Sequence, residues 1–577
     1  MAVLQTILEK PAVTCPPMLN SVNRAECEHL LNIGLFFDGT DNNSNPERKD
    51  APANREEVAT NIWKLSTAYQ DLPVQGHFRQ YVSGVGTPFT ELGRQEAEAG
   101  GGPFGAGGEA RILYGLLQVI NFAHASIRGA SHKHFDQVRL RALCSDTRLP
   151  QPGEGPSRPL TKDEMFLQSL GLSGGLDGAS HQEKKAFFSR QSDQLRGILT
   201  HYKTVPKVTS IYLDVFGFSR GAAQARVFVT WLHRYMLMGG QLFGVPSYVR
   251  MLGLFDTVAS VGRPETLGGS GHGAWASAKD LQIHPAVKNC VHFVALHELR
   301  TNFPSDSVRV GDTLPPNCHE HVVPGAHSDV GGGYAPLDQG KGVRLLRGSL
   351  QPVADAASRL SNLPLNEMYE AAVRACEGHS YAPWMRIDED KRFIASFGLA
   401  ELPRLRDEVK DYFSVCGVPN SLPIHMALRE HGVRYLAWRY LVNEAKRFGR
   451  LPSVERAEMY PSSYTYYKLG QQIFSAQVEA MKLGAFSGDL HPKARDIFKQ
   501  IQALATKQQD ALLKLGVFFD DWVHDSFAGF IGKFNKDKPQ PTTWGELTHR
   551  AAENDGYVRW RNVFQGSDDG LNDGKTG

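Results

Sequence analysis

The sequence predicts an α/β fold, in which helices flank a mainly parallel sheet, followed by a mostly helical C-terminal module. Three observations support this prediction. A strand, a helix and a second strand follow one another over residues 32–82, which is typical of a parallel βαβ unit. Apolar strands that end in turn-forming residues then recur up to about residue 340. Beyond about residue 346 the apolar residues take helical spacing.

The expected strands are short apolar runs bounded by polar or Gly-rich turns, and two long amphipathic stretches separate the early ones. In chain order they are the strand 32–37, the helix 58–69, the strand 78–82, the helix 109–127 and the strands 212–216, 249–255, 291–296 and 320–323. A Gly-rich loop over 100–108 precedes the second helix. This alternation of strands and helices predicts a parallel sheet.

The character of the sequence divides the chain into three parts. Residues 1–29 contain several prolines and little periodicity, so we interpret them as an N-terminal arm or packing segment. Residues 30–345 form the expected catalytic domain, in which the Pro- and Gly-rich stretch 143–190 is predicted to be a flexible, solvent-facing insertion. Residues 346–577 form the helical module, which could face a membrane or a partner.

Bulk composition limits the class of protein. A chain of 577 residues is too long for one ordinary core. The 63 Lys and Arg residues nearly balance the 61 Asp and Glu residues. No basic stripe is visible, so we expect no nucleic-acid partner. Seven cysteines without paired spacing fit folding in a reducing cytoplasm. We expect neither a signal peptide nor a membrane span, because no suitable apolar run is present.

The stretch from Gly217 to Gly221 has the pattern G-x-S-x-G and lies between an apolar strand and a helix with one apolar face. Together these features are typical of a nucleophile elbow, a sharp turn that exposes a serine hydroxyl above the sheet. Gly217 and Gly221 leave room for the strand and the helix to pack closely. The pattern predicts that Ser219 is a nucleophile. The alternative is a Gly-rich turn in a buried α/β unit.

Two residues further along the chain have the placement expected of an acid and a base. A serine hydroxyl needs a histidine to take its proton and a carboxylate to fix the tautomer of that histidine. In enzymes with this elbow the order is Ser, acid, His, on loops that follow strands. Asp256 comes directly after an apolar strand, and His327 lies in a later Gly-rich loop. We therefore predict the triad Ser219, Asp256 and His327.

Other acidic and histidine residues have simpler interpretations. Asp214 lies inside the strand before the elbow and is expected to be a buried structural acid. Asp312 is expected to cap a turn, and Asp329 to orient its own loop. His292 and His297 flank a strand and are expected to be core or surface residues.

A scattered set of residues, His319, His321, His327 and Asp329, has the side-chain types of a metal site. Its spacing is irregular, and neither H-E-x-x-H nor C-x-x-C accompanies it. We therefore expect no metal and no other cofactor.

An ester-cleaving serine also needs two N–H donors for the negative oxygen of its tetrahedral intermediate. One is expected to be the backbone N–H of Arg220, directly after the nucleophile. The second is expected from the turn after the first strand, Asp38-Gly39-Thr40, with Asp38 and Gly39 as the candidates because Gly39 allows close approach. The alternative, which does not exclude this role, is that Asp38 caps the turn.

Four motifs occur in order along the chain: Phe36-Phe37-Asp38-Gly39-Thr40, Gly217-Phe218-Ser219-Arg220-Gly221-Ala222 with Ala225-Arg226, Gly253-Leu254-Phe255-Asp256-Thr257-Val258-Ala259, and Pro324-Gly325-Ala326-His327-Ser328-Asp329-Val330-Gly331-Gly332-Gly333-Tyr334. Together they resemble the α/β-hydrolase family that was first described as a domain of unknown function. That family includes the first class of type VI secretion lipase effectors, which are antibacterial phospholipases. The resemblance covers about residues 30–340.

The resemblance implies an α/β-hydrolase-like fold, the triad Ser219, Asp256 and His327, and deacylation of glycerophospholipids without a catalytic metal. This is a phospholipase A type of carboxylic ester hydrolysis. It also implies synthesis in the producer's cytoplasm without a signal peptide, and delivery by a secretion spike or adaptor protein. The site of action would be the periplasm of a neighbouring bacterium, peripherally at the phospholipid membrane surface, with a cognate immunity protein as a further partner.

Two stretches of the C-terminal half are candidates for a lipid surface. The aromatic segment 518–530 also resembles a segment of such effectors. Asp520, Asp521 and Asp525 within it would be repelled by anionic headgroups, so packing on the hydrolase core is the favoured interpretation. The helix around 429–447 carries five basic residues and is a better membrane-facing candidate, although a solvated cationic face is the favoured interpretation there.

Three functions are consistent with these features. The leading hypothesis is a lipolytic serine hydrolase that cleaves phospholipid acyl esters and damages target-cell membranes. The second is a soluble carboxylesterase or thioesterase with a deep pocket. The third is a catalytically silent binding protein on a hydrolase scaffold.

Overall fold

The computed structural model of the protein describes residues 4–13, 28–44, 58–94, 105–129, 131–150, 158–201, 207–261, 272–300, 303–345, 352–376, 397–459, 461–484, 494–528 and 557–566. The part of the predicted arm at 14–27, the Gly-rich residues 100–104 and the aromatic residue Phe530 lie outside the described residues.

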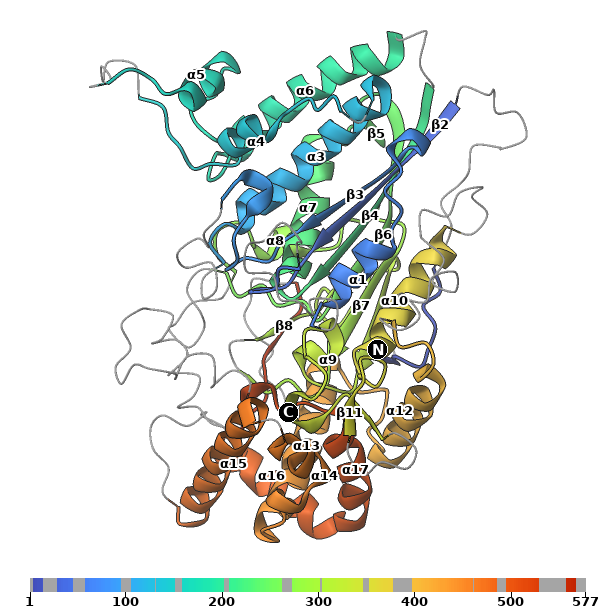
Figure 1. Cartoon of the computed structure of the whole chain (residues 1–577), viewed down its shortest axis with the longest axis vertical. Helices are drawn as coiled ribbons and strands as arrows, with labels where there is room; N and C mark the ends of the chain where they lie inside the picture. The colour runs from blue at the N-terminus through green and yellow to red at the C-terminus, as the bar shows by residue number, and fades with distance from the viewer. Residues whose placement is uncertain are drawn as a thin grey trace.

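An eight-stranded sheet forms the centre of the described structure (Figure 1). Its strands pair in parallel in the order β1-β9-β7-β6-β4-β2-β3, and a short β5 pairs with β6 in antiparallel. The strands are β1 Gln5–Thr6, β2 Glu28–Phe37, β3 His77–Val82, β4 Lys207–Phe218, β5 Gln241–Leu242, β6 Val245–Phe255, β7 Cys290–Ala295 and β9 Cys318–Val323. The predicted mainly parallel α/β fold is confirmed.

The chain order creates a switch point between two central strands. Strand β2 pairs with β3 on one side and with β4 on the other. Ligand sites in open α/β sheets form at the carboxyl ends of strands at such a point, because the connections there diverge. The register sets Phe37 opposite Gly217. The turns that follow β2 and β4 therefore lie next to each other.

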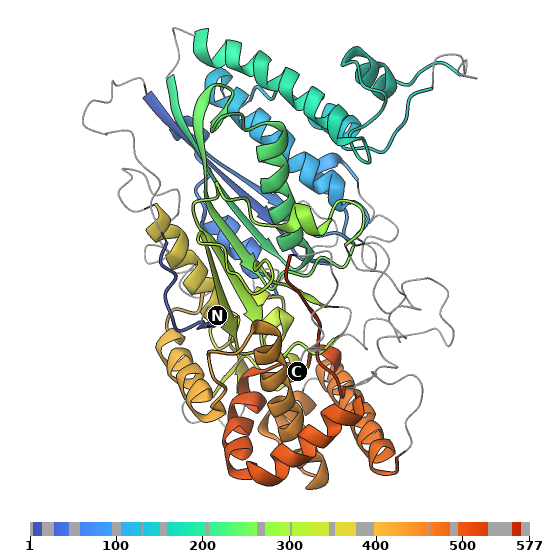
Figure 2. The same cartoon turned by 180° about the vertical axis from the view of Figure 1, so that it is seen from behind.

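Helices cover both faces of the sheet, as Figures 1 and 2 show from opposite sides. The first face carries α3 Gly108–Arg128 and α7 Arg220–Tyr235, with α6 His181–His201 and α8 Ala278–Leu281 packed on them. The second face carries α1 Asn61–Ala68 and α10 Asn362–Ala375. Two apolar clusters fill the spaces between the sheet and these helices.

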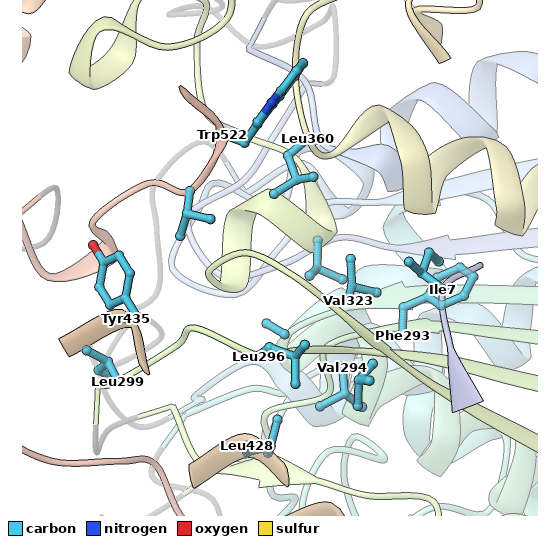
Figure 3. Packing of buried hydrophobic residues seen from close by; sticks show 14 of the residues in the cluster. Ile7, Phe293, Val294, Leu296, Leu299, Val323, Leu360, Leu428, Tyr435 and Trp522 are labelled. Atoms are coloured by element: carbon cyan, nitrogen blue, oxygen red, sulfur yellow. The ribbon is translucent and has the colours of Figure 1, made fainter. Parts of the chain in front are cut away.

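The C-terminal half is helical, as predicted, and shares a core with the sheet. Its helices are α12 Leu402–Cys416, α13 Ile424–Glu444, α14 Pro452–Glu458, α15 Pro461–Lys482, α16 Ala494–Lys507 and α17 Gln509–Trp522. Figure 3 shows sheet residues such as Val294 and Val323 in one cluster with Leu428 of α13 and Trp522 of α17. The two halves are therefore joined by a continuous apolar core.

Of two expectations about the N-terminal half, the interpretation of residues 1–29 as a packing segment agrees with the described residues 4–13, and that of a solvent-facing insertion needs correction. The arm takes part in the sheet, because β1 pairs with β9 and the neighbouring Leu4 and Ile7 are buried. The stretch 143–190 is not simply solvent-facing: it includes α5 Lys162–Ser169 and the first half of α6, and Leu167, Phe187 and Phe188 are buried. Apolar residues at helical spacing outweigh the Pro and Gly content there.

The structure separates the two candidates for a lipid surface. The aromatic segment packs in the core as favoured, since Phe519 and Trp522 of α17 are buried. Both interpretations of the basic helix, a solvated cationic face and a membrane-facing surface, are wrong for two of its residues on α13. Arg434 is buried against Glu430, and Arg439 is buried against Asp525 with 2.6 Å between Nη1 and Oδ2.

Within the described residues, no helix has both the length and the apolar character needed to cross a membrane. The five cysteines among these residues are all free thiols, at positions 144, 290, 318, 376 and 416.

Asp214 is the buried structural acid that the sequence predicts. It lies in the middle of β4 and forms a bidentate pair with Arg250 of β6, with Oδ1 2.9 Å from Nε and Oδ2 2.5 Å from Nη2. The hydroxyl of Tyr69 donates to the same carboxylate at 2.9 Å. All three side chains are fully buried, so the carboxylate charge depends on these donors rather than on water.

Arg250→Met should lower the free energy of unfolding by about 3–5 kcal/mol, because it leaves the Asp214 carboxylate buried without a counter-charge. Arg139→Met is the matched control, since Arg139 pairs with Asp136 at the exposed surface and its loss should cost less than about 1 kcal/mol. Urea unfolding followed by circular dichroism measures both. Equal losses in the two variants would contradict a special role for the buried pair.

Candidate active site

Ser219 lies at the sharp turn between β4 and α7. Its backbone has φ 58° and ψ −127°, a conformation that residues with a side chain rarely adopt. Such strain persists only where the surroundings enforce it, and it is the conformation expected of a nucleophile elbow.

Close packing around the elbow explains its two glycines. A Cβ on Gly217 would lie 2.4 Å from the carbonyl oxygen of Gly221, and a Cβ on Gly221 would lie 2.2 Å from the carbonyl oxygen of Phe37. Both distances are too short for any side chain. The glycines therefore let α7 approach β4 and the end of β2, which fixes the turn that bears Ser219.

Asp256 follows the last residue of β6 and is fully buried. Its Oδ2 is 2.6 Å from Nδ1 of His327, and its Oδ1 accepts a hydrogen bond of 2.9 Å from the backbone N–H of Ala295. A carboxylate on Nδ1 selects the tautomer whose other ring nitrogen, Nε2, can accept a proton. The structure thus brings the predicted acid and base together.

His327 begins the short helix α9, His327–Gly331, and only 4% of it is exposed. The centroid of its ring is 4.6 Å from that of Phe218 and 5.0 Å from that of Phe303. This apolar burial lowers the pKa of His327 below 6.5, while Asp256 and Glu298 act in the opposite direction.

Ser219 and Asp256 are linked through the backbone. The N–H of Ser219 donates to the carbonyl of Phe255 at 3.0 Å, and the carbonyl of Ser219 accepts from Val258 at 3.3 Å. The predicted nucleophile is thus bonded to residues on either side of the predicted acid. Its hydroxyl makes no hydrogen bond to His327 in the described structure, and such bonds are often long before substrate binds.

Sequence reasoning missed Arg561, which pairs directly with the predicted acid. Its Nη1 is 2.7 Å from Oδ2 of Asp256 and its Nη2 is 2.5 Å from Oδ1. Burial alone would raise the pKa of Asp256, but the guanidinium of Arg561 and the bond from His327 keep it well below its usual value. No motif marks Arg561 in the sequence, and only its position after an aromatic residue, Trp560, sets it apart.

A second buried pair supports the base. The backbone N–H of His327 donates to Oε2 of Glu298 at 3.3 Å, and the guanidinium of Arg300 forms a bidentate pair with this carboxylate. Burial would raise the pKa of Glu298, but Arg300 lowers it to about 2. The hydroxyl of Ser526, from the helical half, donates to Oε1 at 3.0 Å.

The predicted oxyanion donors have mixed outcomes. As the first residue of α7, Arg220 has an N–H with no acceptor inside the helix. In the turn after β2 the two named donors are occupied, because Asp38 N–H donates to Val82 and Gly39 N–H donates to Oδ1 of Asp38. This corrects the expectation for that turn. The N–H of Thr40 donates to no acceptor among the described residues. The side-chain Oγ1 of Thr40 accepts a hydrogen bond of 2.6 Å from Nε of Arg220.

Asp38 acts instead as the cap that shapes this turn. Its carboxylate accepts from the hydroxyls of Thr60 at 2.8 Å and Tyr81 at 2.6 Å, as well as from Gly39. Burial raises its pKa to about 6, against the lowering effect of these donors. The buried carboxylate of Asp38 therefore joins this turn to Thr60 and Tyr81.

The remaining candidates have structural positions. Asp329 orients its own loop as expected, accepting from Ala326 N–H at 2.9 Å, and it also pairs with His524 of the helical half. His292 and His297 are core residues: Nε2 of His292 accepts from Thr257 N–H, and Nδ1 of His297 accepts from Gly325 N–H. Among the described residues, no group of three or more potential ligands is arranged to bind a metal ion.

A strained serine after the central strand, with an acid–histidine pair beside it, defines the class of α/β-hydrolase-like proteins. Residues 238–371, which include Asp256 and His327, match the family model described as "T6SS, Phospholipase effector Tle1-like, catalytic domain". The resemblance to the type VI secretion phospholipase effectors is thus confirmed. No curated protein matches the chain.

Two solved structures are similar to the chain. An uncharacterized protein from Pseudomonas aeruginosa aligns with a TM-score of 0.66 and 21% identity, over 93% of this chain and 80% of that one, which shows a shared fold. The Tle1 effector bound to the VgrG spike of the type VI secretion system aligns with a TM-score of 0.27 and 20% identity, over 57% of each chain.

The acidic limb of kcat/KM should lie below pH 6.5, since His327 must be neutral to accept a proton and burial lowers its pKa. Activity should therefore persist at mildly acidic pH and fall as His327 gains a proton. The rate of hydrolysis of a soluble short-chain ester, measured between pH 4 and 8, gives the midpoint of the acidic limb. This midpoint is compared with the usual histidine pKa of about 6.5.

Asp38 titrates in the same range, so Asp38→Asn is the control that removes its contribution. If the acidic limb of kcat/KM is still present in Asp38→Asn, it is assigned to the protonation of His327. A midpoint clearly above 6.5 in the wild-type protein would contradict the assignment.

Proposed function

We propose that the protein is a lipolytic serine hydrolase that cleaves acyl esters of glycerophospholipids, a phospholipase of type A. Ser219 is the nucleophile, His327 the base and Asp256 the acid that orients it, all within residues 30–345 as the catalytic domain. The observation that supports this best is the 2.6 Å bond between Asp256 and His327 beside a serine in the strained elbow conformation.

The geometry supports a two-step reaction. Nε2 of His327 takes the proton of Ser219 as Oγ attacks the ester carbonyl, and the same proton then passes to the departing lysophospholipid oxygen. Water, deprotonated by His327, next attacks the acyl-enzyme, and the fatty acid leaves as Ser219 regains its proton. The N–H groups of Arg220 and Thr40 are the best-placed donors for the negative oxygen in both steps.

We further propose that the protein acts as an antibacterial type VI effector. Its similarity to the Tle1-like family supports delivery out of the producer cell. The Tle1 effector of the solved complex is bound to the VgrG spike, and a spike or adaptor protein is the corresponding partner here. The proposed site of action is the target membrane on its periplasmic side, where a cognate immunity protein would block the enzyme.

Purified protein should release fatty acid and lysophospholipid from phosphatidylethanolamine–phosphatidylglycerol vesicles. Ser219→Ala should reduce this release by about 10³-fold or more, because no other group supplies the attacking oxygen. Ser192→Ala is the matched control, since Ser192 is also buried, lies on α6 and has a hydroxyl without a hydrogen-bond partner in the described part of the chain. Circular dichroism checks that both variants are folded, and mass spectrometry identifies the products.

Three results would point elsewhere. Full activity in Ser219→Ala would refute the nucleophile. Cleavage of soluble short-chain esters or thioesters that far exceeds cleavage of vesicles would favour a soluble esterase. A folded wild-type protein that a fluorophosphonate probe does not label at Ser219 would favour a silent binding protein.

A further inference from the structure

The residues 557–566 form a strap that connects the helical half to the edge of the active site. The strap contains β12 Val563–Phe564, which pairs in parallel with β8 Ser305–Asp306. In Figures 1 and 2 it is the dark red segment that leaves the helices and runs along the catalytic domain. A chain segment in this position can carry a side chain into the site from outside the catalytic domain.

Both ends of the strap are fixed by buried contacts. At its start, the N–H groups of Tyr557 and Val558 donate to Oε1 of Gln477 on α15. At its end, Gly311 N–H donates to Gln565, and the side chain of Gln282 donates to Gly566 at 2.7 Å. Arg561 lies between these two anchored ends, so the backbone that carries it is held on both sides.

Arg561 meets the acid with both of its terminal nitrogens. The guanidinium bonds both oxygens of Asp256, and Nη2 also donates to the carbonyl of Ala295 at 3.0 Å. Planar bidentate pairing fixes the plane of a carboxylate as well as its charge. Oδ2, which also receives the bond from His327, is thereby held in one orientation.

Resting on the proposed function, we propose that Arg561 is a positioning residue of the catalytic site, so that the helical half acts in the reaction through the 557–566 strap. The arginine keeps the buried carboxylate of Asp256 ionised and turned toward His327. It also neutralises part of the charge that His327 faces, which allows the imidazole to remain neutral and ready to accept the proton of Ser219.

The charged groups around His327 determine the expected pH effect. Asp256 faces its ring from the end of β6, and Glu298 and Arg300 face it from the segment after β7. Asp329 shares α9 with it and is paired with His524. From the strap, Arg561 contacts this set through its bonds to Asp256. Its loss leaves Asp256 uncompensated, which favours the protonated imidazole and moves the acidic limb to higher pH.

The test uses the full chain and the rate at which a fluorophosphonate probe labels Ser219, measured between pH 5 and 9. In this reaction Oγ of Ser219 bonds to phosphorus, fluoride leaves and His327 takes the proton. Arg561→Met should lower the rate about 10²-fold and move the acidic limb upward by about 1 pH unit. Arg561→Lys, which keeps the charge but not the bidentate geometry, should leave the limb in place and lower the rate about 10-fold.

Val563→Ala is the control for the strap itself, since it weakens the packing of a buried residue of β12 without touching Asp256. It should leave the limb in place. A folded Arg561→Met variant with the wild-type rate and limb would overturn the proposal. If that variant does not fold, Arg561→Lys decides, and a wild-type rate in it would overturn the proposal too. Absence of labelling in the wild-type protein would instead contradict the proposed function.

Discussion

The carboxylate of Asp256 is the point on which the rest of the site depends. It is fully buried, and a buried charge is stable only with opposite charge and hydrogen bonds around it. Ala295, His327 and Arg561 supply these from three separate segments of the chain. Because the other two donors hold the carboxylate, it keeps one orientation toward His327, so the geometry of the proposed site and the stability of this region have the same physical basis.

The helical half contacts residues of the proposed active site as well as the core. Ser526 donates to Glu298, which holds the backbone of His327, and His524 pairs with Asp329 on α9 at 2.6 Å. Apolar side chains of both halves lie in one cluster. The boundary near residue 346 that composition suggests is therefore a change in secondary structure rather than a break between independent units.

The elbow illustrates a different constraint, which is steric. Ser219 is strained, and the close approach of α7 to β2 and β4 enforces that strain because Gly217 and Gly221 have no side chains. The same approach brings the turn after β2 next to the turn that bears Ser219. The carboxylate of Asp38 accepts from the N–H of Gly39 in the turn after β2, so this N–H is occupied.

Local sequence was enough for the features that depend on neighbouring residues. The strained turn at Ser219, the place of Asp256 after β6 and the succession of strands and helices along the chain are encoded in short runs of glycines, apolar residues and turn formers, because backbone geometry is decided within a few residues. The same reasoning foresaw that Asp38 caps its turn but misjudged it as an oxyanion donor, and it misjudged the exposure of Arg439, because the partners of both residues could not be seen in the sequence.

Only the tertiary structure determined which oppositely charged residues form pairs. Arg561 and Asp256 are 305 positions apart, and Arg439 and Asp525 are 86 apart. No spacing rule connects residues so distant, because their contact is set by how the helical half packs on the sheet. Burial strengthens the attraction between two opposite charges because it excludes water from around them. Burial is a property of the whole folded chain, so no single segment determines it.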